Sequence, residues 1–129
     1  MLSPPHADVL NRRPVWGALS ELFLDTSFDA SDKDRIAGIL AQSPYNVSDL
    51  EHILLWEVGP ACRHNLFSIA GEWLEFDPEW LESRILRGPS TIMRLWAATL
   101  GRVSVYSSLN WKAIKRGIAA KRGNDSKAT

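Results

Sequence analysis

Apolar residues recur at helical spacing along most of the chain, in segments separated by polar or proline-containing breaks. The pattern predicts a first helix over residues 13–24, RPVWGALSELFL, with Pro14 in the first turn, where proline is tolerated. A polar stretch follows, and a second helix is expected over residues 32–42, opened by a capping box of Ser31 and Asp34. Ser43-Pro44 ends it, because proline disfavours the α conformation in the residue before it.

A third helix is predicted to open at Ser48, whose hydroxyl can cap free amides while Glu51 reaches back to the Ser48 amide. Gly59-Pro60 is expected to interrupt this helix, and a fourth helix is expected over roughly residues 65–75. Its apolar positions Leu66, Ile69, Ala70 and Trp73 lie on one side.

The clearest start and stop signals enclose residues 78–87. Asp77 fits the N-cap and Pro78 the first helical position, while Gly88-Pro89 closes the helix after Arg87. A further helix is predicted over residues 91–103. Residues 102–111 have the β-branched and aromatic content of a strand but can also begin a last helix, and helix is favoured because a single short strand would have no partner.

These elements predict an all-α fold, a compact bundle of about six helices in a single domain. The expected organisation is a flexible N-terminal arm over residues 1–11, a helical domain over 12–122 and a disordered basic tail over 123–129.

Composition narrows the class of protein. The 129 residues suffice for one domain with its own core, and six tryptophans make aromatic packing a large part of the burial energy. Cys62 is the single cysteine and cannot form an internal disulfide, which favours a reducing compartment. The first residues lack the apolar run of a signal peptide, and no stretch approaches the roughly 18 apolar residues of a membrane span. We therefore expect a cytoplasmic protein without membrane contact.

The net charge of zero hides a division along the chain. Residues 20–82 contain thirteen acids and three bases, whereas residues 83–129 contain ten bases and one acid. Such asymmetry concerns partners rather than fold. Two explanations stay open: the halves neutralise each other within the fold, or each presents a charged surface to a partner.

The stretch EVGPACRHNL, residues 57–66, holds the most reactive group of side chains. Glu57, Cys62 and His64 are the candidates for hydrolysis, but a Cys–His pair two residues apart has no assured geometry, and two ligands do not make a zinc site. At ~100° per residue, Glu57 lies about 20° from Leu50, inside the apolar stripe of its helix. Glu57 is therefore predicted to be a buried structural acid, bonded to backbone amides or to Arg63, Arg12 or Arg13.

Acidic residues cluster in and around GEWLEFDPEWLES. Paired carboxylates can perform acid–base chemistry, but a solvated acidic face is the simpler interpretation, and such a face can dock a basic partner. The expected partner-binding residues are Glu72, Glu75, Glu79, Glu82, Asp29 and Asp32.

The basic C-terminal segment is a candidate nucleic-acid contact. Its bases could meet phosphates and Trp111 could stack on a base, although no helix-turn-helix or aromatic platform is recognisable. The alternative is a solvated amphipathic helix with Trp111, Ile114 and Ile118 as its buried edge. The bases concerned are Lys112, Lys115, Arg116, Lys121 and Arg122.

Residues 12–85 resemble a small uncharacterised bacterial family, a domain of unknown function. The resemblance lies in RRPVWGALSELFLDT, SPY at residues 43–45, LEHILLWEVGPACRHNL and SIAGEWLEFDPEWL. It implies a helical core, and it transfers no activity and no catalytic residue. The C-terminal third has no match in this resemblance.

Together these features predict a non-enzymatic protein–protein interaction module without cofactor, metal or catalytic residues. An inhibitor or antitoxin-like immunity protein is expected, which neutralises a basic toxin or effector through its acidic surface. The alternatives are a nucleic-acid-binding or regulatory protein that uses the C-terminal helix, and a hydrolase that uses Glu57, Cys62 or His64.

Overall fold

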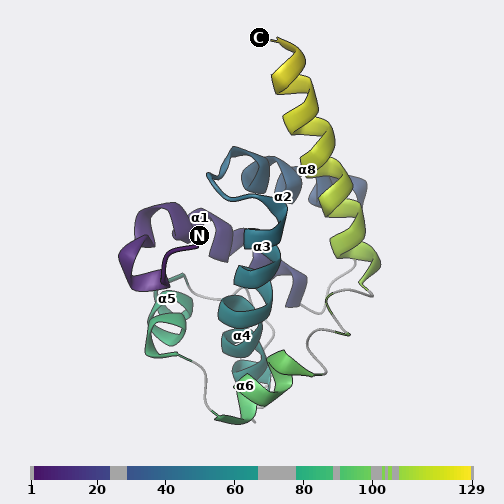
Figure 1. The fold of residues 1–129 in the computed structure, drawn as a ribbon. Helices are drawn as coiled ribbons and strands as arrows, with labels where there is room; N and C mark the ends of the chain where they lie inside the picture. The colour runs from purple at the N-terminus through teal and green to yellow at the C-terminus, as the bar shows by residue number, and fades with distance from the viewer. Residues whose placement is uncertain are drawn as a thin grey trace.

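Helices account for nearly all of the described chain in the computed structural model (Figure 1). The structure describes residues 2–23, 29–66, 78–88, 91–99, 103, 105 and 108–128. No strand occurs among these residues, which confirms the predicted all-α single domain. The helices are α1 (Val9–Ser20), α2 (Ala30–Gln42), α3 (Val47–Ile53), α4 (Gly59–Leu66), α5 (Pro78–Arg87), α6 (Thr91–Ala98) and α8 (Leu109–Ala128).

Helical structure begins within residues 1–11, the segment predicted to be an N-terminal arm. Pro5–Ala7 form a 3-10 turn, and α1 begins at Val9 rather than at residue 13. Pro14 therefore lies inside α1, where it cannot donate to the carbonyl of Leu10. The helix continues through the proline to Ser20.

Two helix N-caps lie two residues before their predicted positions. In α2 the N-cap is Asp29, which forms a reciprocal capping box with Asp32 instead of the predicted Ser31 and Asp34. In α3 it is Asn46, which forms a box with Asp49 instead of Ser48 and Glu51. Both regions offer several overlapping pairs of capping residues, and carboxylate or amide side chains took the role that the hydroxyls were expected to fill.

The predicted interruption at Gly59-Pro60 is wrong. A π-helical segment, Leu54–Val58, joins α3 to α4, so the three form one continuous rod from Val47 to Leu66 at the centre of the domain (Figure 1). The amide of Gly59 donates to the carbonyl of Leu54, five residues back. This wider turn accommodates Pro60, whose ring in a regular α-helix would meet the carbonyl four residues earlier. The predicted fourth helix at 65–75 falls largely outside the described residues.

Helix α5 begins and ends where the sequence predicts. It runs from Pro78 to Arg87, and Gly88 follows with a φ of 82°, the left-handed conformation that glycine adopts at little cost. The predicted N-cap Asp77 lies outside the described residues. Beyond α6, Val103 and Val105 are both helical, which agrees with the choice of helix over strand at those two positions.

Helix α8 packs along α2, a segment about 80 residues earlier in the sequence. Trp111, Ile114 and Ile118 are completely buried, as the amphipathic interpretation predicts. Gly117 sits against Ala37, where a Cβ atom at residue 117 would lie only 2.8 Å from the Ala37 side chain. The last turns of α8 extend beyond the rest of the domain, and helix is present to Ala128 in the segment predicted to be a disordered tail (Figure 1).

Candidate functional site

Arg12 of α1 and Glu57 of the π-helical segment form a two-point ion pair inside the domain. The guanidinium Nε donates to Glu57 Oε1 at 3.2 Å, and Nη2 donates to Oε2 at 3.0 Å. Arg12 is fully buried and Glu57 is 8 % exposed. Glu57 is therefore buried and bonded to an arginine, as its position on the apolar stripe predicts.

Further donors and acceptors complete this buried cluster. The indole Nε1 of Trp16 donates to Glu57 Oε1 at 2.9 Å, and Arg12 Nη2 donates to the carbonyl of Ser3 at 2.6 Å. Arg12 Nη1 donates to the Tyr45 hydroxyl at 3.3 Å, which in turn donates to the carboxylate of Asp8. The cluster thereby joins α1, the π-helical segment and the turn before α3.

Three groups of this cluster, Arg12, Asp8 and Tyr45, have shifted pKa values. Burial alone would lower the pKa of Arg12, but the bonds to Glu57 and Tyr45 outweigh it and raise that pKa. The hydrogen bond from Tyr45, then that from Asn11, lowers the pKa of Asp8. Burial, then the bond to Asp8, raises the pKa of Tyr45. Arg12 and Asp8 are therefore held charged and Tyr45 neutral.

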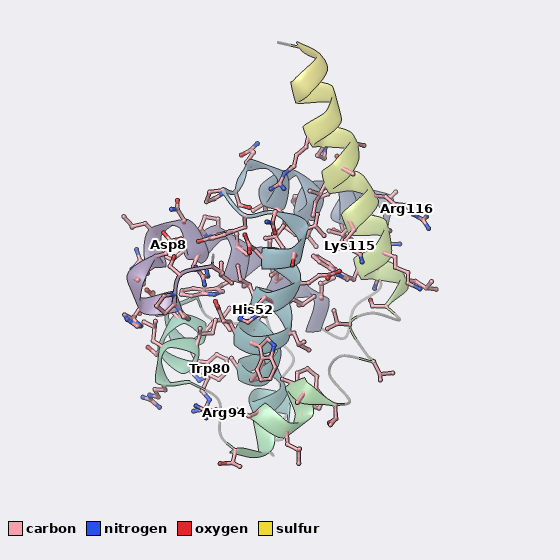
Figure 2. All side chains as sticks on the ribbon, in the orientation of Figure 1. Asp8, His52, Trp80, Arg94, Lys115 and Arg116 are labelled. Atoms are coloured by element: carbon pink, nitrogen blue, oxygen red, sulfur yellow. The ribbon has the colours of Figure 1, made fainter. Side chains whose placement is uncertain are left out.

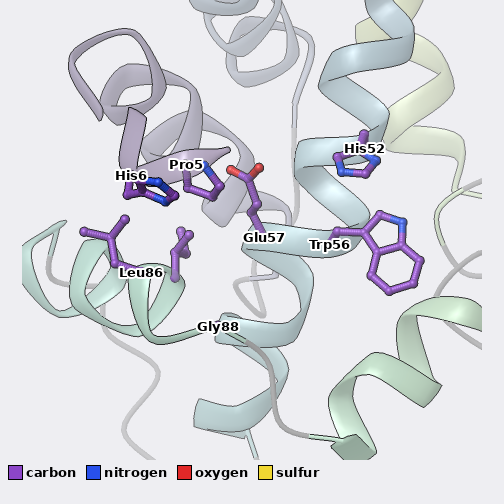
Figure 3. Close-up of a pocket in the computed structure, with 8 residues that line it drawn as sticks. Pro5, His6, His52, Trp56, Glu57, Leu86 and Gly88 are labelled. Carbon is purple, nitrogen blue, oxygen red and sulfur yellow. The ribbon is translucent and has the colours of Figure 1, made fainter. Parts of the chain in front are cut away.

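A pocket of about 360 Å³ opens beside this cluster (Figure 3). Its walls come from the N-terminal turn, the central rod and the end of α5, and Glu57 contributes the buried carboxylate. Figure 3 shows the Glu57 side chain between the Pro5–His6 segment and His52. Pockets of this size with mostly apolar walls and few polar groups are the usual form of a binding site. The lining residues are Pro5, His6, His52, Trp56, Glu57, Ile85, Leu86 and Gly88.

Cys62 does not face this pocket as a reactive thiol. It is fully buried, and burial raises the pKa of its thiol far above the ordinary value, which keeps it protonated and unreactive. The side chains of Arg63 and His64 lie outside the described part of the structure. Among the described residues, no group of three or more His, Cys, Asp or Glu side chains could hold a metal ion.

The described members of the predicted acidic surface lie in two places. Asp29 and Asp32 cap α2, and Asp32 also lies 3.8 Å from Arg35. Glu79 and Glu82 belong to α5, where Glu82 pairs with Arg13 of α1 at 3.0 Å. Glu72 and Glu75 fall outside the described residues. The acids of α5 share their helix with Ile85 and Leu86, which line the pocket.

The basic helix α8 is largely engaged within the fold. Lys115 and the indole of Trp111 both bond Glu51 Oε1, at 2.8 and 3.2 Å, and Lys121 pairs with Asp34 at 3.0 Å. Trp111 is buried and cannot stack on a base. Part of the charge asymmetry is thus neutralised between α8 and the acidic helices. Lys112 and Arg116 are exposed and have no partner among the described residues. Figure 2 shows the Arg116 side chain on the outer side of α8.

Arg122 has a different role in the same helix. Its guanidinium donates to the backbone carbonyls of Leu40, Ala41, Ser43 and Tyr45, at 3.2, 3.3, 3.3 and 2.5 Å. These carbonyls lie at the C-terminal end of α2 and just after it, where an α-helix has no internal donors left. Arg122 therefore caps α2 and is not available to a phosphate.

Sequence reasoning did not find the pocket. His6, His52, Trp56 and Leu86 come from three separate segments, and no short motif relates them. One signal was present: the apolar pattern of the helix continues up to Pro60 without a break. The π-helical turn that precedes Pro60 is of a kind frequently found at functional sites.

Among the described residues, no helix combines the length and apolarity needed to cross a bilayer. No curated protein and no solved structure matches the chain significantly. A protein-family match does exist, and it extends beyond the segment in which the resemblance was seen. Residues 10–117 match the domain of unknown function DUF7079, and the chain therefore belongs to that family.

Proposed function

We propose that this protein is a non-enzymatic module that binds another protein and inhibits it, in the manner of an immunity protein. The observation that carries the proposal is the pocket beside Glu57, whose apolar wall continues onto the exposed side of α5. Leu86, 43 % exposed, belongs to both. A partner can insert one side chain into the pocket and cover α5 around it.

The state of the reactive groups supports binding rather than hydrolysis. The Cys62 thiol is buried and protonated, and both oxygens of Glu57 already accept hydrogen bonds from Arg12 and Trp16. A general base must reach the proton that it abstracts, and a carboxylate held on three donors is poorly suited to this task.

Two acids, Glu79 and Glu82, support a basic partner at the N-terminal part of α5, whereas Arg84 and Arg87 lie in its last turn and Glu82 also pairs with Arg13. Glu79 and Leu86 are seven residues apart and so lie on one side of the helix, with Glu82 between them. Acids around an apolar anchor would steer a basic protein towards the pocket and accelerate its association. Glu72 and Glu75 belong to the same proposed acidic surface.

Site-specific photo-crosslinking in cells tests the proposal. A benzophenone amino acid at Leu86 is expected to trap one protein, identified by mass spectrometry, that the same group at the exposed Ala119 of α8 does not trap. The purified partner should then bind the unmodified chain in calorimetry. Leu86→Asp should weaken that binding at least tenfold, and Glu79→Lys should weaken it more than Asp34→Lys, which makes the same charge change on α2. Equal crosslinking at both positions, or unchanged affinity in Leu86→Asp, would contradict the proposal.

A further inference from the structure

The polar end of the pocket has a specific hydrogen-bonding requirement. A carboxylate can accept about four hydrogen bonds, and three donors on Glu57 come from the described part of the chain: Arg12 Nε, Arg12 Nη2 and Trp16 Nε1. The fourth acceptor position lies on the carboxylate of Glu57, and the Glu57 side chain lines the pocket. The pocket thus offers a buried charged acceptor to a ligand that brings a donor.

The charges of the cluster favour a cationic donor. Two carboxylates, Asp8 and Glu57, contact one guanidinium, that of Arg12, at 3.6 and 3.0 Å. The cluster that contains Glu57 thus carries one negative charge in excess, and Glu57 is the member of it that lines the apolar pocket, where ionic hydrogen bonds are stronger than in water. Arg84 lines a small adjoining hollow rather than the pocket itself.

The geometry also distinguishes between the two long cationic side chains. Arg12 already occupies Glu57 with the two-point geometry that a second guanidinium would need. A single acceptor position suits an ammonium group, which is a point donor with three N–H bonds. His6 and His52 also line the pocket, and their imidazole rings lie on either side of Glu57 (Figure 3).

We propose that the pocket receives a lysine side chain of the basic partner, with its ammonium group on Glu57 and its methylene stem against Ile85 and Leu86. Trp56 supplies an aromatic wall, which attracts a cation and packs against its stem. This inference deepens the proposed function and rests on it, because it names the chemical group through which the partner is recognised.

Three probes of equal length test this inference without the partner: hexylammonium, hexanoate and 1-hexanol. Each is titrated into the folded protein at pH 7 while NMR follows the indole signal of Trp56 and the amide of His52. Hexylammonium is expected to bind about tenfold more tightly than the other two, the ratio that one charge-assisted bond provides. If hexanoate binds as tightly as hexylammonium or more tightly, the inference is overturned and the pocket binds an anion near Arg84. If 1-hexanol binds as tightly as hexylammonium, the inference is overturned and the pocket binds apolar groups without regard to charge.

Variants identify the groups responsible. Leu86→Ala should weaken all three probes alike, whereas Glu57→Gln should remove the preference for the amine and retain 1-hexanol. Arg84→Met is the control and should leave the preference for hexylammonium intact. If Glu57→Gln does not fold, His52→Ala provides the second test and should reduce amine binding selectively. If a partner is trapped at Leu86 but the pocket shows no preference for hexylammonium, the inference that a lysine enters the pocket is refuted. The proposed function would remain valid in that case.

Discussion

Arg12 and Glu57 are 45 positions apart in the sequence and meet as a two-point ion pair in the interior. The pair fastens α1 to the π-helical segment, and the pocket opens beside Glu57. Burial of two charges is costly, so the pair needs the additional hydrogen bonds from Trp16 and to Ser3 that surround it. The stability of the domain and the shape of its pocket therefore depend on the same few side chains.

The Trp16 indole is expected to contribute through its hydrogen bond as well as its bulk. Trp16→Phe should lower the free energy of unfolding by about 1.5–3 kcal/mol more than the loss of ring volume alone, because it leaves a buried ionised acceptor short of a donor. Trp111→Phe is the matched control, since that indole is equally buried but bonds Glu51, a more exposed carboxylate. Urea denaturation of both variants measures the difference, and equal losses would contradict the prediction.

Asp8 is expected to make the domain sensitive to acid. Its pKa is lowered in the folded state, by the hydrogen bond from Tyr45 first, so its contribution is fully present above the ordinary carboxyl pKa of 3.8 and is lost as the pH falls through the lower folded value. Asp8→Asn should therefore reduce stability at pH 7 and flatten its decline between pH 5 and pH 2. The urea midpoints of wild type and Asp8→Asn across this pH range provide the test. If the stability of the two proteins falls equally with pH, protonation of Asp8 does not cause the acid sensitivity.

The contact between α2 and α8 leaves no room for a side chain at Gly117. Gly117→Ala would place a methyl group 2.8 Å from the side chain of Ala37, and overpacking of this kind costs about 1–3 kcal/mol. Gly17→Ala in α1 meets nothing within 4 Å and should instead be neutral or stabilising by up to about 1 kcal/mol, the helix preference for alanine. Thermal unfolding of the two variants should shift in opposite directions. A Gly117→Ala protein as stable as wild type would show that the helices do not pack this closely.

Arg122 is expected to be the most important base of α8 for stability. Arg122→Met removes the donor to four backbone carbonyls at the end of α2 and should cost about 1–3 kcal/mol. Arg116→Met, an exposed change on the same helix, should remain within about 0.5 kcal/mol of wild type. Hydrogen exchange at the last turn of α2 should accelerate in the first variant alone. Similar behaviour of the two variants would argue against the capping role.

Local sequence patterns predicted the helices better than the connections between them. The ends of α5 follow from proline and glycine chemistry within a few residues, and the angular position of Glu57 already indicated its burial. The identity of its partner did not follow, because Arg12, Arg13 and Arg63 are equivalent in a sequence and only the packing of α1 against the rod selects Arg12. The continuity of the rod through Pro60 was not predicted. Proline interrupts a regular α-helix because of the carbonyl four residues earlier, and the π-helical turn before Pro60 removes this conflict.

The pocket was beyond prediction for the same reason. Its walls combine the N-terminal turn, the rod and the end of α5, and their proximity depends on tertiary packing rather than on spacing. For the basic helix α8, by contrast, periodicity predicted the packing correctly. Its charges suggested nucleic acid, yet Lys115, Lys121 and Arg122 meet acids or carbonyls of α2 and the rod, and the buried edge of Trp111 follows from helical periodicity alone.

A double-mutant cycle on Arg12 and Glu57 tests the central claim most directly, namely that these two residues form one energetic unit. Arg12→Met, Glu57→Gln and the double variant are compared with wild type by urea denaturation at pH 7. Each single change should cost about 3–5 kcal/mol, because either one leaves a buried charge or its donors without a partner. The double variant should cost less than the sum of the two, with an interaction energy of about 1–3 kcal/mol. Strict additivity of the two losses would contradict the pairing on which this account of the site depends.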